Sequence, residues 1–521
     1  MLATRWTENF TISDEELDYL VNVLLERETP MTTRELAHLL IETRLQKAQD
    51  LLTKQYKDTQ VYIPAKQYDV GTRLVFTEMA LATATVTAVR SGNNETYGAF
   101  DVIAVKFDEA NHNIGANPRE FAANLATEHI LNTVIEENPL TTNSDIDIDE
   151  TLEANNAHIL RTTLAALKEH SALERVAGFW FPRELVMDCD MGVMHLSEAV
   201  LDMAGGGPLA PEDIIEQIGG LGDAPLKLQV FSLNFALNND DRFDEVGSLG
   251  QVMWFLNRME PEAVREIPEL LQYTPIEYDD DLLSDEIFDL ETELDDEHTP
   301  IEFEGRLPKA TSALIYPHRQ LGTLPLNAKT RTVFPVARTP RIHVELVDET
   351  DGETFSGWVV HNHKYVFGLL DYYTKHSLPI GADISVKLGE EESQIIVSHE
   401  AYNPRTEWIR ILTPKNNQIT FEQKKRAIGA EYDELMIIGV DDIEAVNKLA
   451  KTYKDKTIVS ILRELITELA KLSPQGTVHA VTLYSAVNVI RRCAPGPIFA
   501  LLTANPDFED VGNHYWKLNT T

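Results

Sequence analysis

The sequence predicts an α+β multidomain chain that combines repeated small helical domains, each closed by a β-hairpin, with two β-rich, barrel-like domains. Three observations carry this prediction: a tryptophan-bearing hairpin motif that recurs, helical segments upstream of each copy, and two strand-rich stretches between the copies. A chain of 521 residues, 43% of them hydrophobic, can form several such domains. A single hydrophobic core rarely serves more than about 250–300 residues.

The recurring motif is a hairpin with a glycine near its turn and a tryptophan in its second strand. Its three copies span residues 174–181, 243–256 and 508–518. The glycine can adopt the positive φ that a tight turn requires. The second strand then brings its tryptophan back over the preceding helices. The predicted core residues are therefore Trp180, Trp254 and Trp516.

Helical segments precede each hairpin, and three helices followed by a hairpin make a winged-helix domain. The second copy is complete, with helices expected at 196–203, 211–218 and 227–237. Pro211 and the acids that follow it suit a helix start. The third copy repeats the scheme, with helices expected at 458–472, 478–492 and 498–503.

The first copy is split by an insertion. Helices at 14–27 and 32–45 supply its front half, and Thr32 with Glu35 is typical of a capping box. Its third helix, at 157–169, follows the insertion. Alternating residues predict a small β-barrel within the insertion. Its strands are expected at 73–76, 83–90 and 99–107, with a turn at 91–94.

Two stretches separate the second and third copies. Residues 277–304 contain acids throughout and no Lys or Arg, yet Leu283, Ile287, Leu290 and Leu294 recur at helical spacing. A solvated helix or tether is the interpretation. Residues 311–412 are rich in strands and predict a second, larger β domain. Its strands are expected at 341–347, 355–360, 365–369, 384–388, 395–397 and 408–412.

These assignments divide the chain into eight segments. In order they are 1–56, the first half of winged helix 1; 57–135, the small β-barrel insertion; 150–186, the second half of winged helix 1 with its wing; 187–275, winged helix 2; 276–305, an acidic linker; 306–415, the β-rich domain; 416–455, a helical connector; and 456–521, winged helix 3.

The segments 196–256 and 458–518 resemble winged-helix domains of the HARE type, which occur in bacterial and chromatin-associated proteins. The resemblance lies in the closing pattern of phenylalanine, two acids, valine and glycine, followed by a tryptophan, and it covers roughly a third of the chain. That family includes the amino-terminal domain of the RNA polymerase delta subunit, and similar domains accompany restriction enzymes. It implies no catalytic residues.

A second resemblance concerns the β-rich domain. Residues 365–369, the pair Tyr372 and Tyr373, and residues 378–382 are similar to B3-like DNA-binding barrels, in which an aromatic helix precedes a turn of leucine, glycine and an acid. The resemblance implies a barrel that contacts DNA.

A winged helix reads the major groove with its third helix and touches phosphates with its wing. The polar and basic residues at these positions, together with the densest basic stretch, are the predicted nucleic-acid contacts. They are Asn156, Arg161, Lys168, Arg175, Arg183, Lys227, Gln229, Lys424, Lys425 and Arg426. The alternative for each cation is a solvated face paired with nearby carboxylates. The third copy offers only Thr503 as a donor on its third helix, which favours a protein-binding module.

Composition limits the other classes. The formal net charge of −39 restricts any contact with a polyanion to one local surface. Cys189 and Cys493 form neither a disulfide framework nor a metal knuckle. No run approaches the roughly 20 apolar residues of a membrane span, and the acidic start is unlike a signal peptide, so a cytoplasmic protein without a membrane partner is expected.

Motifs of known chemistry were sought as well. His361-Asn362-His363 invites comparison with HNH nucleases, but adjacent residues do not supply their spread ligand set, and a turn is the better interpretation. The glycines 205–207 lack the Lys-Ser/Thr of a phosphate-binding loop. We therefore predict no enzyme, no catalytic residue, no metal site and no cofactor.

Three functions fit these features. The first is a non-enzymatic DNA-binding or transcription-associated protein that uses winged-helix modules. The second is an acidic protein-interaction scaffold that binds RNA polymerase or another basic partner. The third is an accessory subunit of a restriction or DNA-processing system.

Overall fold

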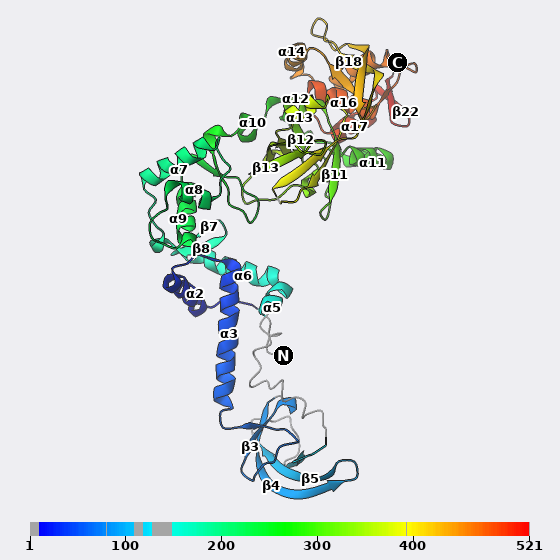
Figure 1. Ribbon diagram of the computed structural model, residues 1–521. Helices are drawn as coiled ribbons and strands as arrows, with labels where there is room; N and C mark the ends of the chain where they lie inside the picture. The colour runs from blue at the N-terminus through cyan, green and yellow to red at the C-terminus, as the bar shows by residue number, and fades with distance from the viewer. Residues whose placement is uncertain (1–9, 80, 109–117, 128–147, 392, 520–521) are drawn as a thin grey trace. The chain divides into compact units, whose positions relative to one another are not determined.

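The computed structural model describes residues 10–79, 81–108, 118–127, 148–391 and 393–519 (Figure 1). The fold is mixed α and β, with helices and several separate sheets. The chain divides into two compact units, residues 1–187 and 188–521, and each is described by itself.

The first unit contains a small helical domain closed by a three-stranded sheet of order β1-β8-β7. Its elements are α2 (Asp14–Arg27), β1 (Met31–Thr32), α3 (Thr33–Gln55), α5 (Ile148–Ala154), α6 (Asn156–Glu169), β7 (Leu173–Val176) and β8 (Phe179–Pro182). The predicted capping box is present, because Glu35 accepts from the Thr32 N–H and its own N–H donates to Thr32 Oγ1. A second capping box, of Ser13 and Glu16, starts α2.

The insertion forms a five-stranded sheet of order β2-β3-β4-β5-β6. The strands are β2 (Gln60–Val61), β3 (Arg73–Phe76), β4 (Ala82–Asn94), β5 (Gly98–Phe107) and β6 (Arg119–Ala123). The segments that follow the two edge strands, β2 and β6, are hydrogen-bonded to each other, because the N–H groups of Asn124 and Leu125 donate to the carbonyls of Lys66 and Pro64. The sheet is therefore nearly closed into a barrel.

The turn expected at 91–94 is corrected. Strand β4 continues through Asn94, because Gly92 pairs with Phe100 and Asn94 pairs with Gly98. The chain reverses at residues 95–97, where the Asn94 side chain accepts from the Thr96 N–H. A short polar side chain that bonds two residues onward favours a turn just after it.

The second unit begins with another small helical domain. Its elements are α7 (Met191–Met203), α8 (Pro211–Ile218), α9 (Leu226–Asn238), β9 (Phe243–Glu245) and β10 (Trp254–Leu256). Helix α7 starts five residues before the expected 196, because Asp190 accepts from the Val193 N–H and caps it. Pro211 opens α8 as predicted.

The C-terminal segment builds a third helical domain. Its elements are α15 (Ile458–Ala470), β21 (Val478–His479), α16 (Ala480–Ile490), α17 (Pro495–Ala504), β22 (Phe508–Gly512) and β23 (Tyr515–Leu518). The sheet order is β21-β23-β22, which corresponds to β1-β8-β7 of the first unit.

The three tryptophans hold the same position in all three domains. Each lies opposite the residue two positions before the second helix: Trp180 pairs with Met31, Trp254 with Leu209 and Trp516 with Val478. All three are buried, which confirms their prediction as core residues. The three domains therefore share a similar order of helix, pairing residue, further helices and hairpin, although the second has an isolated bridge at Leu209 in place of the short strand and the first contains α5 in addition.

Between the second and third helical domains lies a mixed seven-stranded sheet of order β11-β16-β17-β13-β14-β15-β12. Its strands are β11 (Lys309–Ala313), β12 (Thr323–Pro325), β13 (Arg341–Asp348), β14 (Thr354–Val360), β15 (Tyr365–Phe367), β16 (Asp383–Leu388) and β17 (Gln394–Ser398). Two short helices accompany it, α12 (Tyr316–Leu321) and α13 (Leu370–Lys375), and α10 (Glu262–Arg265) precedes it.

The strand expected at 408–412 does not belong to this sheet. It is the end of β18 (Ala401–Leu412), which pairs antiparallel with β19 (Phe421–Ala430) and parallel with β20 (Ile438–Val440). The predicted boundary at 415 thus falls inside a hairpin. The expected helical connector is helical only at α14 (Ile443–Tyr453), since residues 421–430 form strand β19 and pair with β18.

The acidic segment is also corrected, because it is neither a tether nor fully solvated. Helix α11 (Asp285–Leu294) buries Ile287 in the C-terminal core, and Leu283, Leu290 and Leu294 pack around that core. The three acids that follow, Asp295, Asp296 and Glu297, are themselves buried. Their partners lie far away in the sequence, so the acidic composition alone gave no sign of burial.

Candidate nucleic-acid interface

The first helical domain leaves one face of α6 exposed. The opposite face buries Ile159, Thr163 and Leu167 in the domain core. Arg161 and Lys168 lie seven residues apart, two turns along the exposed face, and both side chains are exposed. Neither forms an ion pair with any residue of the described ranges. Asn156 is the first residue of α6, and its side chain lies outside the described part of the structure.

The hairpin beside α6 presents two more predicted contacts. Arg175 is exposed on β7, with its guanidinium carbon 5.7 Å from the centre of the Trp180 ring. The side chain of Arg183 is 70% exposed and lies 3.6 Å from Glu174. An exposed pair of this kind contributes about 0–1 kcal/mol, so Arg183 can exchange its carboxylate for a phosphate at little cost.

The second domain supplies fewer contacts than the sequence predicted. Lys227 is exposed near the start of α9. Gln229, however, is only 8% exposed. Its side chain accepts from the Leu221 N–H and donates to the carbonyls of Gly222 and Ala224. It fixes the loop before α9, and because all of its bonding groups are engaged, its prediction as a nucleic-acid contact is corrected.

The hairpin of the second domain packs against the seven-stranded sheet. Arg341 binds both Asp244, at 2.7 Å, and Glu260, at 2.8 Å. The Phe255 ring meets Trp358 edge to face, with centroids 4.9 Å apart. The hairpin acids Asp244 and Glu245 are thus partnered within the chain by Arg341 and Arg338. Their partners lie about a hundred positions away, where no local pattern points to them.

The third helix of the third domain is covered by the chain itself. Gly496, at the start of α17, lies so close to Tyr278 and Glu291 that a Cβ there would clash with both. Tyr278 in turn donates to Glu291, 3.3 Å away. The face of α17 that the sequence predicted to bind a protein is thus covered within the chain by the acidic segment around α11.

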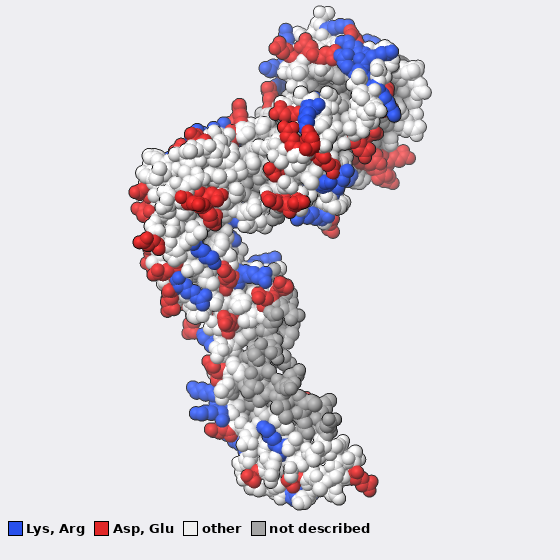
Figure 2. Space-filling model, viewed as in Figure 1, with Lys and Arg blue, Asp and Glu red and all other residues white. Residues whose placement is uncertain are grey.

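The basic stretch Lys424, Lys425 and Arg426 lies on strand β19, and Figure 2 shows basic side chains gathered where Figure 1 labels β18. Lys424 and Arg426 both bind Asp441, each at 2.9 Å. Lys425 is exposed, with its Nζ 5.1 Å from the ring centre of Trp408. Sequence reasoning found the cations and missed the tryptophan, because only the strand register brings the two together.

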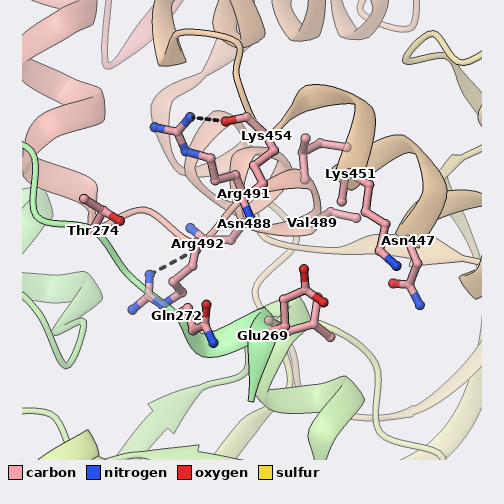
Figure 3. A pocket seen from close by; sticks show the side chains of 13 residues that line it. Glu269, Gln272, Thr274, Asn447, Lys451, Lys454, Asn488, Val489, Arg491 and Arg492 are labelled. Carbon is pink, nitrogen blue, oxygen red and sulfur yellow. Dashed lines mark hydrogen bonds between the residues drawn. The ribbon is translucent and has the colours of Figure 1, made fainter. Parts of the chain in front are cut away.

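A concavity of about 470 Å³ lies beside α14 (Figure 3). Lys451 and Asn447 extend into it from α14, and Glu269 and Gln272 come from the facing segment. Arg491 lines it too and donates to the carbonyls of Lys454 and Lys456. Lys451, Lys454 and Arg491 line it beside one exposed carboxylate, Glu269, and the fourth lining cation, Arg492, is buried and paired with Asp296 and Glu297. The concavity therefore suits a small anion.

A titratable cluster joins α13 to the end of β13. His376 Nε2 lies 2.7 Å and Lys375 Nζ 2.9 Å from Asp348 Oδ2. Burial alone would raise the pKa of Asp348, but these hydrogen bonds outweigh burial and hold that pKa below its ordinary value. Tyr372 shares a 2.7 Å hydrogen bond with His399, and burial raises the pKa of the tyrosine. The cluster fastens the helix to the strand.

In the described ranges, no group of three or more His, Cys, Asp or Glu side chains is arranged to hold a metal ion. Nor is any helix there long and apolar enough to cross a membrane. The chain matches no known protein family, no curated protein and no solved structure. Functional inference therefore rests on the contacts of the chain itself.

Proposed function

We propose that this chain is a non-enzymatic, cytoplasmic, transcription-associated DNA-binding protein built on three winged-helix domains. The support is the shared order of elements. In each domain a helix, a short strand or single residue that pairs with the hairpin tryptophan, and at least two further helices precede the hairpin. In winged helices of the helix-turn-helix class the third helix enters the major groove.

One observation favours the first domain as the one that contacts DNA. Within its own unit, the first domain leaves one face of its third helix exposed, with Arg161 and Lys168 on α6, and Arg175 of its hairpin is exposed as well. The second domain buries its hairpin against the seven-stranded sheet, and the third buries α17 under the acidic segment. We therefore assign groove contact to Arg161 and Lys168, and phosphate contact to Arg175 and Arg183.

Changing Arg161 and Lys168 together to alanine is expected to weaken duplex binding about tenfold. Each cation that neutralises a phosphate adds about 0.9 to the slope of log K against log salt. Because Arg161 and Lys168 are assigned to base edges in the groove, the slope should change little in this variant, whereas changing the phosphate contacts Arg175 and Arg183 together to alanine should lower it by roughly 1.8. The measurement is a gel shift of a 30-base-pair duplex at several salt concentrations.

A matched control makes the same charge change elsewhere in the unit. Lys54, in the last turn of α3, and Lys57, just after it, are exposed, and changing both to alanine should leave affinity and slope unchanged. If the unaltered protein retains no duplex at micromolar concentration and low salt, the proposed function is wrong.

The B3-like resemblance belongs to the same proposal. Helix α13 carries Tyr372 and Tyr373 and precedes the turn with Leu378 and Gly381, as the resemblance implies. The tyrosine rings are buried, so they support the sheet and leave any DNA contact to its exposed loops.

An acidic interaction scaffold is the second candidate. The observation in its favour is the outer face of α11, where Asp285, Glu286, Asp289 and Glu293 are exposed, and Figure 2 shows the acids gathered there. Such a face suits a basic partner such as an RNA polymerase surface. An accessory role in a restriction system has the family resemblance behind it, and none of the contacts above favours it.

The scaffold is tested by changing Asp289→Asn and Glu293→Gln. Glu293 lies in the last turn of α11, where negative charge opposes the helix dipole, and Asp289 lies in the middle of the helix beyond its first turn, so folding should not suffer. We expect co-migration with purified bacterial RNA polymerase to weaken several-fold. The control, Glu302→Gln with Glu304→Gln, should leave it unchanged. If the unaltered protein does not co-migrate with the polymerase, the scaffold proposal is wrong.

A further inference from the structure

The hairpin β18–β19 exposes a tryptophan that the helical domains do not use. Trp408 is 62% exposed, more than any other aromatic residue in the described ranges. Tryptophan is usually drawn into a core or an interface because its large ring gains much from burial. A tryptophan left in solvent on a regular strand therefore indicates a surface that binds something.

The strand register shows which face carries this ring. Ile409 and Ile411 are buried in a small core with Ile428 on one face of the hairpin. Because neighbouring residues on a strand point to opposite faces, Trp408 lies on the other. Directly opposite it in the register is Lys425, whose ammonium group sits over the indole ring. The fold thus holds a cation against an open aromatic face.

A second pair of the same kind lies along the same strand. The guanidinium carbon of Arg405 stands 5.3 Å from the ring centre of Tyr402, and Arg405 is exposed. Two aromatic rings, each with its own cation, therefore occur on one strand. In so acidic a chain an isolated surface cation would usually pair with a carboxylate. Two cations placed against aromatic rings therefore indicate a specific surface.

The charge of the hairpin supports an anionic partner. Lys424 and Arg426 share the single carboxylate of Asp441. Glu407 lies opposite Arg426 in the register. Residues 401–430 together contain six cations, Arg405, Arg410, Lys415, Lys424, Lys425 and Arg426, against two carboxylates, Glu407 and Glu422, in a protein whose formal net charge is −39. A local surplus of positive charge against that background favours a polyanion over an ordinary protein surface.

We infer that the hairpin β18–β19 binds single-stranded nucleic acid, with Trp408 and Tyr402 stacking on bases and Lys425 and Arg405 contacting phosphates. Bases of a duplex already stack on one another, so their faces are closed to an aromatic side chain. Bases of a single strand are open, and stacking on aromatics beside cations is the common mode of sequence-tolerant single-strand binding. The inference rests on the proposed nucleic-acid function, but it adds a second binding surface that is separate from the first helical domain.

The test measures binding of a fluorescent 15-nucleotide oligothymidine by anisotropy in the full chain. Trp408→Ala is expected to weaken binding about tenfold, and Trp408→Phe to restore most of it, because phenylalanine still stacks. Lys425→Gln should weaken binding less. Binding should also quench tryptophan fluorescence in the unaltered chain and not in Trp408→Ala. Duplex binding should be the same in all variants.

Two controls match these changes. Tyr97→Ala removes another exposed aromatic residue, and Lys415→Gln removes a cation at the other end of the same hairpin. Both should bind as the unaltered chain does. Because Trp408 is exposed, its loss should leave the unfolding transition unchanged, which separates binding from folding.

The outcomes distinguish the two proposals. Loss of oligothymidine binding in Trp408→Ala with duplex binding intact supports the hairpin as a separate surface. Equal binding by Trp408→Ala and the unaltered chain, or no oligothymidine binding at all, overturns the inference even when the duplex is bound. Loss of duplex binding in the Arg161 and Lys168 variant bears only on the first domain.

Discussion

Replacing Arg492 by methionine is expected to lower the free energy of unfolding of the second unit by about 3–5 kcal/mol. The side chain is fully buried, as are Asp296 and Glu297, its two carboxylate partners. Its Nη2 lies 2.6 Å from Asp296 and 2.7 Å from Glu297. Methionine would fill much of the space and leave both carboxylates without their cation.

The cost is large because the network joins three parts of the unit. Tyr484 of α16 donates to Asp296, 2.6 Å away. His318 of α12 lies 3.2 Å from Glu297, and Asp295 accepts from two backbone N–H groups at residues 328 and 329. The acidic segment therefore fastens the third helical domain to the seven-stranded sheet.

The effect should shrink as the pH falls. Burial alone would raise the pKa of Glu297, but the charge of Arg492 and the hydrogen bond with His318 hold it well below its ordinary value. Without Arg492, burial dominates and Glu297 takes up a proton more readily. The difference between variant and unaltered chain should therefore be smaller at pH 5.5 than at pH 7.5.

Urea unfolding followed by circular dichroism measures the difference, and hydrogen exchange of residues 480–504 locates it. Arg491→Met is the matched control. Arg491 is only partly buried and bonds two backbone carbonyls, so its loss should cost about 1 kcal/mol. Equal effects of the two changes would contradict a structural role for the buried pair.

The elements that the sequence predicted well are those fixed by neighbours along the chain. The capping box of Thr32 and Glu35, the start of α8 at Pro211 and the three hairpins depend on residues a few positions apart. The burial of Asp296 could not be predicted this way, because its partner Arg492 is 196 positions away. A run of acids has the same composition whether solvent or an arginine meets it.

The candidate site was predicted in the same uneven way. Charge density alone pointed to Lys424, Lys425 and Arg426, yet their strand, and with it Trp408, depends on a register between β18 and β19. Gln229 has the chemistry of a base-reading side chain, but the loop before α9 uses all of it. Residue type indicates what a side chain can bind, and tertiary contacts decide what it does bind.

His479→Asn is expected to make the stability of the second unit less sensitive to acid. His479 caps α16, and its Nδ1 accepts from the Val481 N–H at 3.2 Å. Burial, helped by the neighbouring His514 and Arg410 and opposed by Asp433, lowers its pKa to about 4. Protonation would place a hydrogen where the cap needs an acceptor.

The direction follows from the order in which the two states take up the proton. The unfolded chain binds it near pH 6.5, and the folded chain only near pH 4. Stability present above pH 6.5 is therefore lost as the pH falls toward 4, by about 3 kcal/mol at most over the whole range. By pH 5.5 the loss is roughly 1.4 kcal/mol.

Asparagine caps helices as well as any residue and does not titrate. The variant should therefore match the unaltered chain within about 1 kcal/mol at pH 7.5 and lose less stability by pH 5.5. His343, whose pKa burial also lowers to about 4, keeps its own contribution in both proteins. Urea midpoints at the two pH values measure the change, and the exposed His195→Asn is the control. If both variants lose as much stability as the unaltered chain, the cap is not the group that titrates.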